Sequence, residues 1–143
     1  MDKISREQFL ACLDENWQVF IDRFERLSPT SQQSFLEKQG YEAFSHLLAH
    51  VVAWWQDGCQ SIKAMRADPA LPLANYDVNA FNAQAIERLN GFSRVEMGQM
   101  FMAQHQVIRD LVANLSDAEI SQENINTRLY YEIISHWSEH ALE

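Results

Sequence analysis

The sequence predicts an all-α protein, a four-helix bundle formed by a single domain over residues 1–143. Apolar residues recur at intervals of three and four over most of the chain, which is the period of an amphipathic helix. Only four Gly and three Pro occur, whereas sandwiches and barrels are rich in Gly and Pro turns. No stretch alternates apolar and polar residues as a half-buried strand does. Long helices with one apolar face must bury those faces against one another, and a bundle achieves this.

The first helix is expected to follow the sequence "SREQ" at residues 5–8. Ser and Gln at this spacing form a capping box, in which each side chain satisfies a backbone N–H at the helix start. Apolar residues then recur at helical spacing as far as Leu27. The sequence "SPTS" is expected to break the pattern, because Pro29 disfavours the α conformation of the residue before it.

The second helix is predicted from Tyr41 to about Arg66, directly after Gly40. Its middle, "LLAHVVAWW", is apolar on nearly every side, as expected of a helix that packs against several neighbours. The sequence "ADPALPLANYD" at residues 67–77 contains two of the three prolines and is predicted to be a linker.

A third helix is predicted after Asp77, which is suited to cap "VNAFNAQAIERL". It pauses at "NGFS", restarts after "SRVE" with the spacing of a second capping box, and runs to Leu115. The sequence "SDAE" at residues 116–119 repeats that spacing, and a final helix is expected over residues 123–142.

Composition and charge limit the classes of function. The chain carries 20 acidic and 11 basic residues, a formal net charge of −9. Nucleic acids and anionic membranes bind clustered Lys and Arg, so neither is expected as a partner. Cys12 and Cys59 form no Cys-x-x-Cys motif, which favours reduced thiols. The sequence shows no signal peptide and no apolar run of membrane-spanning length, so we expect a cytoplasmic protein.

Two of the five histidines lie one helical turn apart near the end of the sequence, in "ISHWSEHALE". His136 and His140 continue the 4, 3, 4 spacing of an inward-facing seam that begins at Leu129. Near Leu129 and Ile133, this seam is expected to pack against the side of the second helix that carries Phe44, Leu47 and Val51. Two imidazoles at i and i+4 can ligate one ion, as in helical His-x-x-x-His metal sites.

The second helix carries another pair of histidines, His46 and His50, also four residues apart. His50 shares a seam with apolar neighbours and is expected to face the core at mid-helix. His46 lies a turn nearer the start of the helix and is expected to extend the site or to lie at its mouth. His105, on the third helix, lies between two glutamines and is expected to be exposed.

A single buried histidine is usually a hydrogen-bonded core residue, and that interpretation stays open for each of these rings. Three imidazoles in one apolar bundle are harder to explain in this way. Each buried polar ring requires a partner, and one metal ion can serve all three. We therefore predict a divalent metal ion held by His50, His136 and His140.

Other residues near these histidines are candidates for a surrounding pocket. Glu139 and Glu132 lie close in sequence to the ligands, and either can orient an imidazole N–H or act as a base. The catalytic candidates are Glu139 and Tyr130, and the pocket candidates are His46, Trp54, Asn82 and Trp137, with Tyr131 beside them. The alternative for each is a partly buried packing residue.

Three stretches of the chain, "LLAHVVAWWQDG", "YDVNAFNAQAIERLNGFSRVEMGQMF" and "ISHWSEHA", together resemble the DinB/YfiT-like superfamily. That group includes the ClbS/DfsB branch and the bacterial thiol-dependent transferases. The resemblance covers roughly residues 8–142. It depends on the histidine placement, the "DVNAFN" segment and the bundle length in combination, because no single motif is very specific.

The resemblance implies a four-helix bundle whose long connection lies between the second and third helices. It also implies a metal site with one histidine from the second helix and two from the last, here His50, His136 and His140. The metal of the family is usually zinc or nickel with open coordination positions, and many members are homodimers. Many relatives begin the second helix with Trp-Ser, where this chain has "GYEAF". ClbS-like members do not clearly depend on the triad, so a complete triad favours the metal-binding branch.

The sequence and the resemblance together predict an enzyme that hydrolyses a small molecule or transfers a low-molecular-weight thiol with the help of the metal. One alternative is a ClbS/DfsB-like hydrolase or self-protection protein that needs no metal. Another is a binding or stress-response protein without turnover. The chain contains no Gly-rich phosphate loop, no Gly-x-Ser-x-Gly and no paired Glu-x-x-His, which argues against the corresponding enzyme classes.

A homodimer is also expected. The resemblance implies it, and three aromatic residues, Trp17, Trp55 and Trp137, look exposed in the sequence pattern. Exposed apolar patches often mark protein–protein interfaces.

Overall fold

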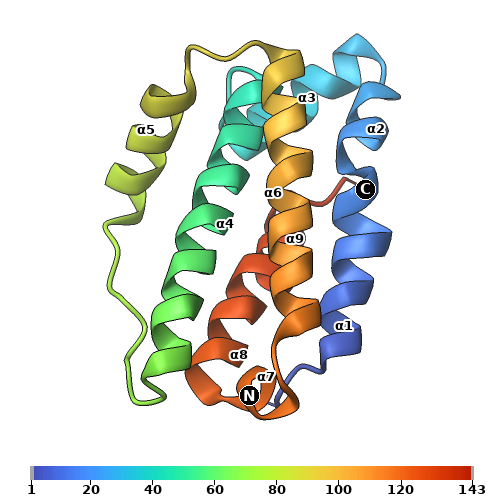
Figure 1. Cartoon of the computed structure of the whole chain (residues 1–143). Coiled ribbons are helices and arrows are strands. Elements are labelled where there is room, and N and C mark those ends of the chain that lie inside the picture. The colour runs from blue at the N-terminus through green and yellow to red at the C-terminus, as the bar shows by residue number, and fades with distance from the viewer. Residues whose placement is uncertain (1, 143) are drawn as a thin grey trace.

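The structure, a computed structural model, describes residues 2–142, and every regular element in this range is helical (Figure 1). The α-helices are α1 (Arg6–Ala11), α2 (Phe20–Glu25), α3 (Pro29–Gln39), α4 (Phe44–Ala67), α5 (Val78–Leu89), α6 (Arg94–Asn114), α7 (Asp117–Ser121), α8 (Glu123–Leu129) and α9 (His136–His140). The π-helical turn η1 (Cys12–Asn16) and the 3-10 turn η2 (Trp17–Val19) join α1 to α2, and the π-helical turn η3 (Tyr130–Ser135) joins α8 to α9. Among these residues, no helix combines the length and the apolarity needed to cross a membrane.

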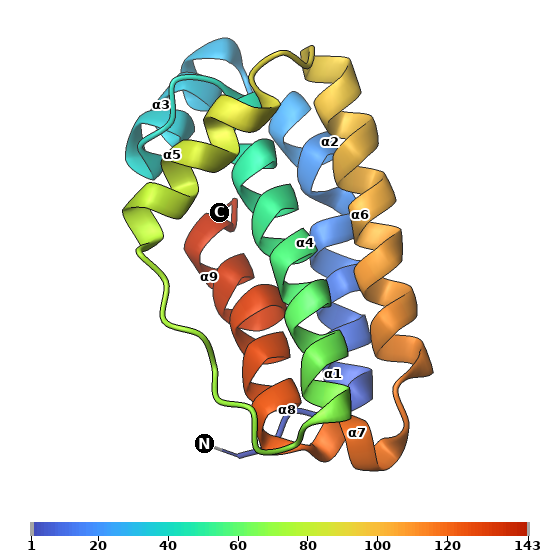
Figure 2. The same ribbon diagram turned by 60° about the vertical axis from the view of Figure 1, so that its left-hand side comes forward.

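The long helical segments lie side by side, and the two ribbon views show their directions. Segments α1–α2 and α8–α9 ascend from the end where the N-terminus lies, whereas α4 and α6 descend toward it (Figures 1 and 2). Helix α4 contacts α5, α6, α8 and η3, and α1 contacts α6 and η3. After α4 the chain returns along the outside of the molecule to α5, which packs on α4 (Figure 2).

The expected contact between the second and last helices is confirmed. Helix α4 contacts both α8 and η3. Leu47 and Val51 on α4 are fully buried in the same hydrophobic core as Leu129 and Ile133. This contact places the second turn of α4, which carries His50, opposite the end of the last helical segment.

The predicted caps are all present. The capping boxes pair Ser5 with Gln8, Ser93 with Glu96 and Ser116 with Glu119. In each box the serine oxygen accepts a hydrogen bond from the N–H three residues later at 3.1 Å. Asp77 caps α5 by accepting from the N–H of Ala80 at 3.1 Å. These bonds are local in sequence, which is why the helix starts could be predicted.

The segment that follows the first predicted helix forms a helix, α3, and not a break. Ser28 is extended, with φ −60° and ψ 156°, and its hydroxyl caps the helix by accepting from the N–H three residues later. Pro29 occupies the first helical position, where a missing N–H costs no hydrogen bond. Helix α3 ends at Gly40, whose φ of 81° is the left-handed conformation common at helix C-termini. Helix α4 therefore starts at Phe44, after the predicted start at Tyr41.

The tryptophans that looked exposed are in the centre of the core. Trp17 and Trp55 are 0% exposed, so the prediction that they lie on the surface is wrong. Their ring centroids are 5.0 Å apart in an edge-to-face arrangement, and Trp17 lies 5.1 Å from the partly buried Trp137. Edge-to-face packing of this kind adds to the burial of apolar surface. These tryptophans consequently give no support to a dimer interface.

The same two tryptophans hold the π-helical turn η3 in place. The indole N–H of Trp55 donates to the carbonyl of Glu132 at 2.9 Å, and that of Trp17 donates to the carbonyl of Ile133 at 3.0 Å. A π-helical turn shifts the helical phase of the residues that follow it and often lies at a functional site. The turn η3 directly precedes His136, so these indoles help to set the direction of the α9 side chains.

Candidate metal centre

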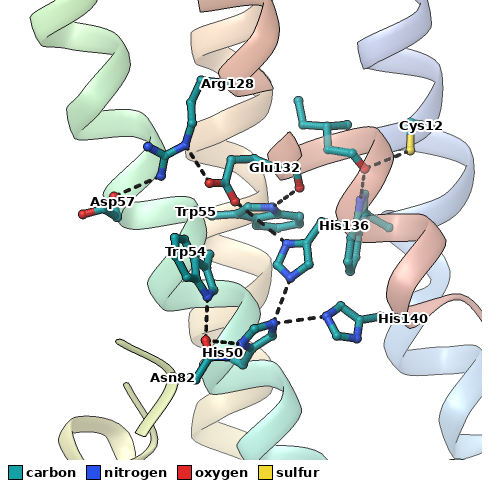
Figure 3. Close-up of polar contacts among 12 residues, drawn as sticks. Cys12, His50, Trp54, Trp55, Asp57, Asn82, Arg128, Glu132, His136 and His140 are labelled. Carbon is teal, nitrogen blue, oxygen red and sulfur yellow. Dashed lines mark hydrogen bonds and ion pairs between the residues drawn. The ribbon is translucent and has the colours of Figure 1, made fainter. Parts of the chain in front are cut away.

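Three imidazoles from two helical segments converge in the interior. His50 comes from α4, and His136 and His140 come from consecutive turns of α9 (Figure 3). The Nε2 atom of His50 lies 3.0 Å from Nε2 of His136 and 3.1 Å from Nε2 of His140. The three rings are 7%, 5% and 6% exposed, and their potential ligand atoms all lie within 4.8 Å of one another. The structure thus brings together the three residues predicted to hold a metal ion.

The tautomer of His50 is determined by its second nitrogen. Nδ1 of His50 lies 3.0 Å from Oδ1 of Asn82, on α5. The same oxygen accepts the indole N–H of Trp54 at 2.7 Å, and an indole can only donate, so the amide must present its oxygen here (Figure 3). His50 therefore carries its proton on Nδ1 and has a lone pair on Nε2.

The tautomer of His140 is determined in the same way from the opposite side. Nδ1 of His140 lies 2.6 Å from Oε1 of Gln39, the last residue of α3. The amide nitrogen of Gln39 donates to the main-chain carbonyl of Glu139 at 3.1 Å, which fixes the orientation of the amide. His140 therefore also has its proton on Nδ1 and its lone pair on Nε2.

His136 completes the set. Its Nδ1 is buried without a hydrogen-bond partner among residues 2–142, and the nearest carboxylate oxygen, Oε1 of Glu132, is 3.9 Å away. If His136 carried its proton on Nε2, it could donate to His50 alone, and the close contact between His50 and His140 would still join two lone pairs. A divalent cation at the point of convergence satisfies all three Nε2 atoms at once, while amide oxygens hold the Nδ1–H groups of His50 and His140, as is usual for metal-ligating histidines. The residues present therefore fit a metal ion.

The triad is neutral at neutral pH, which is the form that ligates metals. Burial lowers the pKa of His50 to about 4, despite the opposing effect of the hydrogen bond that its Nδ1–H donates to Asn82. Burial lowers the pKa of His140 to about 3, and repulsion between the protonated forms of His140 and His50 adds to that effect. Burial also holds the pKa of His136 well below its ordinary value, and the two neighbouring imidazoles add to that effect.

A buried ionic network lies directly behind His136. Arg128, 5% exposed, donates to Glu132 at 2.8 Å and to Asp57 at 3.0 Å (Figure 3). It also donates to the hydroxyl of Tyr76 at 2.9 Å. Burial raises the pKa of Glu132, and the charge of Arg128 opposes that rise. The paired guanidinium keeps a carboxylate in the interior, beside the Nδ1 atom of His136 that lacks a partner.

A cavity of about 480 Å³ opens onto the three histidines. Of the residues proposed from the sequence, Trp54, Asn82, Tyr131, Glu132 and Glu139 line it together with the triad. Three others, His46, Tyr130 and Trp137, are not among its lining residues. Tyr130 and Trp137 pack against the hydrophobic core instead. Burial raises the pKa of Glu139, which lies at the end of α9 beside the ligands.

The prediction that His105 is exposed is wrong. His105 is 2% exposed, and its Nε2–H donates to the carbonyl of Leu13 at 2.8 Å. The two glutamines beside it in sequence point to other sides of α6. A signal was available, because Phe101, His105 and Ile108 follow the 4, 3 spacing of a buried seam.

Several residues of the site were not anticipated from the sequence. They are Gln39, Tyr41, Asp57, Tyr76 and Arg128. The contact of Gln39 with His140 could not be predicted, because helix α3 was not predicted from the sequence. Arg128 lies four residues before Glu132, and this spacing is the only sequence signal for the buried pair.

Comparison of the chain with models of protein families, with curated proteins and with solved structures gives no match.

Proposed function

We propose that this protein is a metal-dependent enzyme of the DinB/YfiT-like superfamily that acts on a small molecule at His50, His136 and His140. The reaction is hydrolysis or the transfer of a low-molecular-weight thiol. One observation carries the proposal: the Nε2 atoms of three buried imidazoles converge, with that of His50 lying 3.0 Å from His136 and 3.1 Å from His140. Asn82 and Gln39 hold two of the three rings in the tautomer that makes this arrangement unfavourable without a cation.

The arrangement of the helices supports membership of that superfamily. We propose that α1–α2, α4, α6 and α8–α9 form a four-helix bundle, with α3, α5 and α7 as additions. The resemblance implies a long connection between the second and third helices; here the predicted third helix is divided into α5 and α6, and the connection from α4 to α6 is long and contains α5. Because α4 and α6 run in the same direction, a connection of this length is required between them (Figure 1).

The chemistry follows from three imidazole ligands and an accessible cavity. A zinc or nickel ion supplies Lewis acidity there and favours the deprotonated form of a thiol or a water molecule that reaches it. Asn82 and Gln39 orient two of the ligands, and Glu132 stands behind the third. The carboxylate of Glu139, at the cavity wall, is positioned to accept a proton from an incoming molecule. Burial raises the pKa of Tyr41 to about 12, so its hydroxyl remains a hydrogen-bond donor.

The alternatives remain a metal-independent ClbS/DfsB-like hydrolase and a binding protein without turnover. The convergent lone pairs favour a metal over the first. The cavity that reaches the ligands favours chemistry over the second, because structural sites are closed and catalytic sites keep an open position. We retain the homodimer and the cytoplasmic location as proposals, the first on the resemblance alone and the second on the free cysteines Cys12 and Cys59.

Cobalt substitution tests whether the centre is open. Cobalt(II) takes the place of zinc and reports its ligands in the visible and near-ultraviolet spectrum. We expect one equivalent of cobalt to bind, and we expect addition of 2-mercaptoethanol to produce a thiolate-to-cobalt charge-transfer band. A spectrum that shows tetrahedral cobalt but does not respond to the thiol would indicate a closed structural site. A protein that binds no cobalt would favour the metal-independent alternative.

A further inference from the structure

Half of the exposed large apolar residues in the described part of the chain line the metal cavity. Residues 2–142 expose six large hydrophobic side chains, and three of them line this cavity. These are Leu73, Val78 and Tyr131, which are 36%, 52% and 54% exposed. They come from the linker, the start of α5 and the turn η3, three segments far apart in sequence. Exposed apolar side chains that converge on one opening mark a surface that binds an apolar group.

The polar groups on the same side of the cavity are already paired with one another. The indole N–H of Trp54 and Nδ1–H of His50 both donate to Asn82. The hydroxyl of Tyr76 donates to Asp57 and accepts from Arg128. A ligand that lies along this side finds chiefly aromatic faces and methyl groups, because these particular donors and acceptors are paired within the protein.

Ring–ring contacts fix the orientation of the aromatic side chain of Trp54, which lines the cavity. The rings of Trp54 and Phe81 stack with their centroids 3.9 Å apart, and Trp54 meets Tyr76 edge to face at 5.1 Å. Such stacking fixes a flat apolar surface between the triad and the exposed rim. The carboxylate of Glu139 lies on the other side of the cavity, near Tyr41, whose pKa it helps to raise. The cavity lining therefore combines apolar side chains, among them Trp54, Leu73 and Val78, with polar ones, among them Gln39 and Glu139.

We propose that the substrate is an amphiphilic small molecule with an apolar body and a metal-binding head group. The body, a chain or a ring, lies along Trp54, Val78 and Leu73, and the head group reaches the three histidines. This inference rests on the proposed function, since the head group is bound by the metal. A cavity of about 480 Å³ lies in the usual size range for small-molecule sites, roughly 300–1,000 Å³.

A series of alkyl hydroxamic acids tests the proposal by binding rather than turnover. The hydroxamate group chelates zinc, and the alkyl chain can be lengthened from acetohydroxamic to butyro-, hexano- and octanohydroxamic acid. Calorimetric titration of the zinc-loaded protein gives each affinity. We expect the affinity to rise about fourfold for each methylene that enters the cavity, from a transfer free energy of about 0.8 kcal/mol per CH₂.

The chain offers a matched control for the cavity rim, which we define as the exposed apolar residues Leu73, Val78 and Tyr131. Val78 is the first residue of α5 and Val95 is the second residue of α6, and both are at least half exposed, at 52% and 68%. Only Val78 lines the metal cavity. The Leu73→Asn/Val78→Asn double variant should bind the octanoyl probe about tenfold more weakly and the acetyl probe unchanged. The Val95→Asn variant should bind both as the original protein does.

The outcomes separate this inference from the proposed function. If acetohydroxamic acid binds and longer chains bind no better, the metal centre stands and the apolar substrate is excluded. If neither zinc nor acetohydroxamic acid binds, the proposed function fails and this inference fails with it. If the chain-length dependence is absent and the rim variant lowers the sedimentation mass of the protein, the exposed residues belong to a dimer interface, which also overturns the inference.

Discussion

The protein buries histidines in two regions, and the two regions use the imidazole in opposite ways. On α6, His105 donates its Nε2–H to the carbonyl of Leu13 at 2.8 Å. On α4 and α9, His50 and His140 donate Nδ1–H to side-chain amide oxygens and turn Nε2 toward each other. All of these rings are less than 10% exposed, and His105 is the most deeply buried of them at 2%.

Burial by itself therefore does not distinguish a metal ligand from a packing residue. The distinction lies in which nitrogen carries the proton and what the other nitrogen faces. His105 forms a complete hydrogen bond to the main chain and needs nothing further. In the triad, His50 and His140 donate from the proton-bearing nitrogen to amide oxygens, and the free Nε2 of each ring faces another ring. Each of the following predictions tests that contrast.

The largest effect is expected from removing a ligand. His136→Ala or His140→Ala should abolish stoichiometric zinc binding, because two imidazoles leave the site with too few ligands. His46→Ala should retain it, since His46 lies on the same helix as His50 but does not line the cavity. Zinc content after equilibrium dialysis measures each variant. If His136→Ala still bound zinc stoichiometrically, His136 would not be a required ligand, and the contrast between the triad and His105 would have no support.

Acid should destabilise the metal-free protein through the triad. Burial lowers the pKa of His50 to about 4 and that of His140 to about 3, whereas the unfolded value is about 6.5. The folded chain then binds fewer protons than the unfolded chain below pH ~6.5. The free energy of unfolding should therefore fall as the pH decreases from about 6.5 toward 4, by about 1.4 kcal/mol per pH unit for each neutral histidine.

Chemical denaturation of chelator-treated protein at about pH 7 and about pH 5 measures this slope. The His50→Asn variant provides the comparison, because it removes one of the titrating groups and should lower the slope. A stability that stays constant over this range would show that the imidazoles are not buried in the neutral form.

Replacing His105, the packing histidine, should lower the stability of the fold and leave zinc binding unchanged. His105→Ala should lower the free energy of unfolding by about 2–3 kcal/mol, through a cavity in the core and a lost hydrogen bond to Leu13. The variant should still bind zinc stoichiometrically. Denaturant unfolding and zinc content, measured on the same preparation, provide both numbers. A loss of zinc binding without a loss of stability would mean that His105 contributes to the metal centre and not to core packing.

A smaller effect is expected at the side chain that orients His50. Asn82→Ala removes the oxygen that accepts from both His50 and Trp54, and should weaken zinc affinity about 10- to 100-fold. Asn79→Ala is the matched control, because Asn79 is exposed on the same helix. Competition with a coloured zinc chelator measures the affinity. Equal affinities in the two variants would mean that the tautomer of His50 does not depend on Asn82.

The three ligands could be identified from sequence because helical spacing is a local property. The seam through Leu129 and His136 and the pair at i and i+4 follow from 3.6 residues per turn, and so do the capping boxes. Features that depend on distant parts of the chain were missed. The turn η3 is stabilised by indoles from Trp17 and Trp55, and no pattern within residues 130–135 indicates it.

Other errors came from applying a local rule in the wrong position. Pro29 was interpreted as a helix breaker, but it occupies the first position of α3, where proline is tolerated. Without α3, the contact of Gln39 with His140 could not be foreseen. His105 was judged by its polar neighbours in sequence, although the neighbours of a helical residue point away from it.

The central claim concerns the position of one proton on each ring, and nitrogen NMR measures it directly. A long-range proton–nitrogen correlation spectrum of the ¹⁵N-labelled, metal-free protein distinguishes the two tautomers of each histidine. The account predicts Nδ1–H in His50 and His140 and Nε2–H in His105. It further predicts that one equivalent of zinc shifts the Nε2 resonances of His50, His136 and His140 and leaves those of His105 in place. An Nε2–H tautomer in His50 or His140, or a spectrum that zinc does not change, would contradict it.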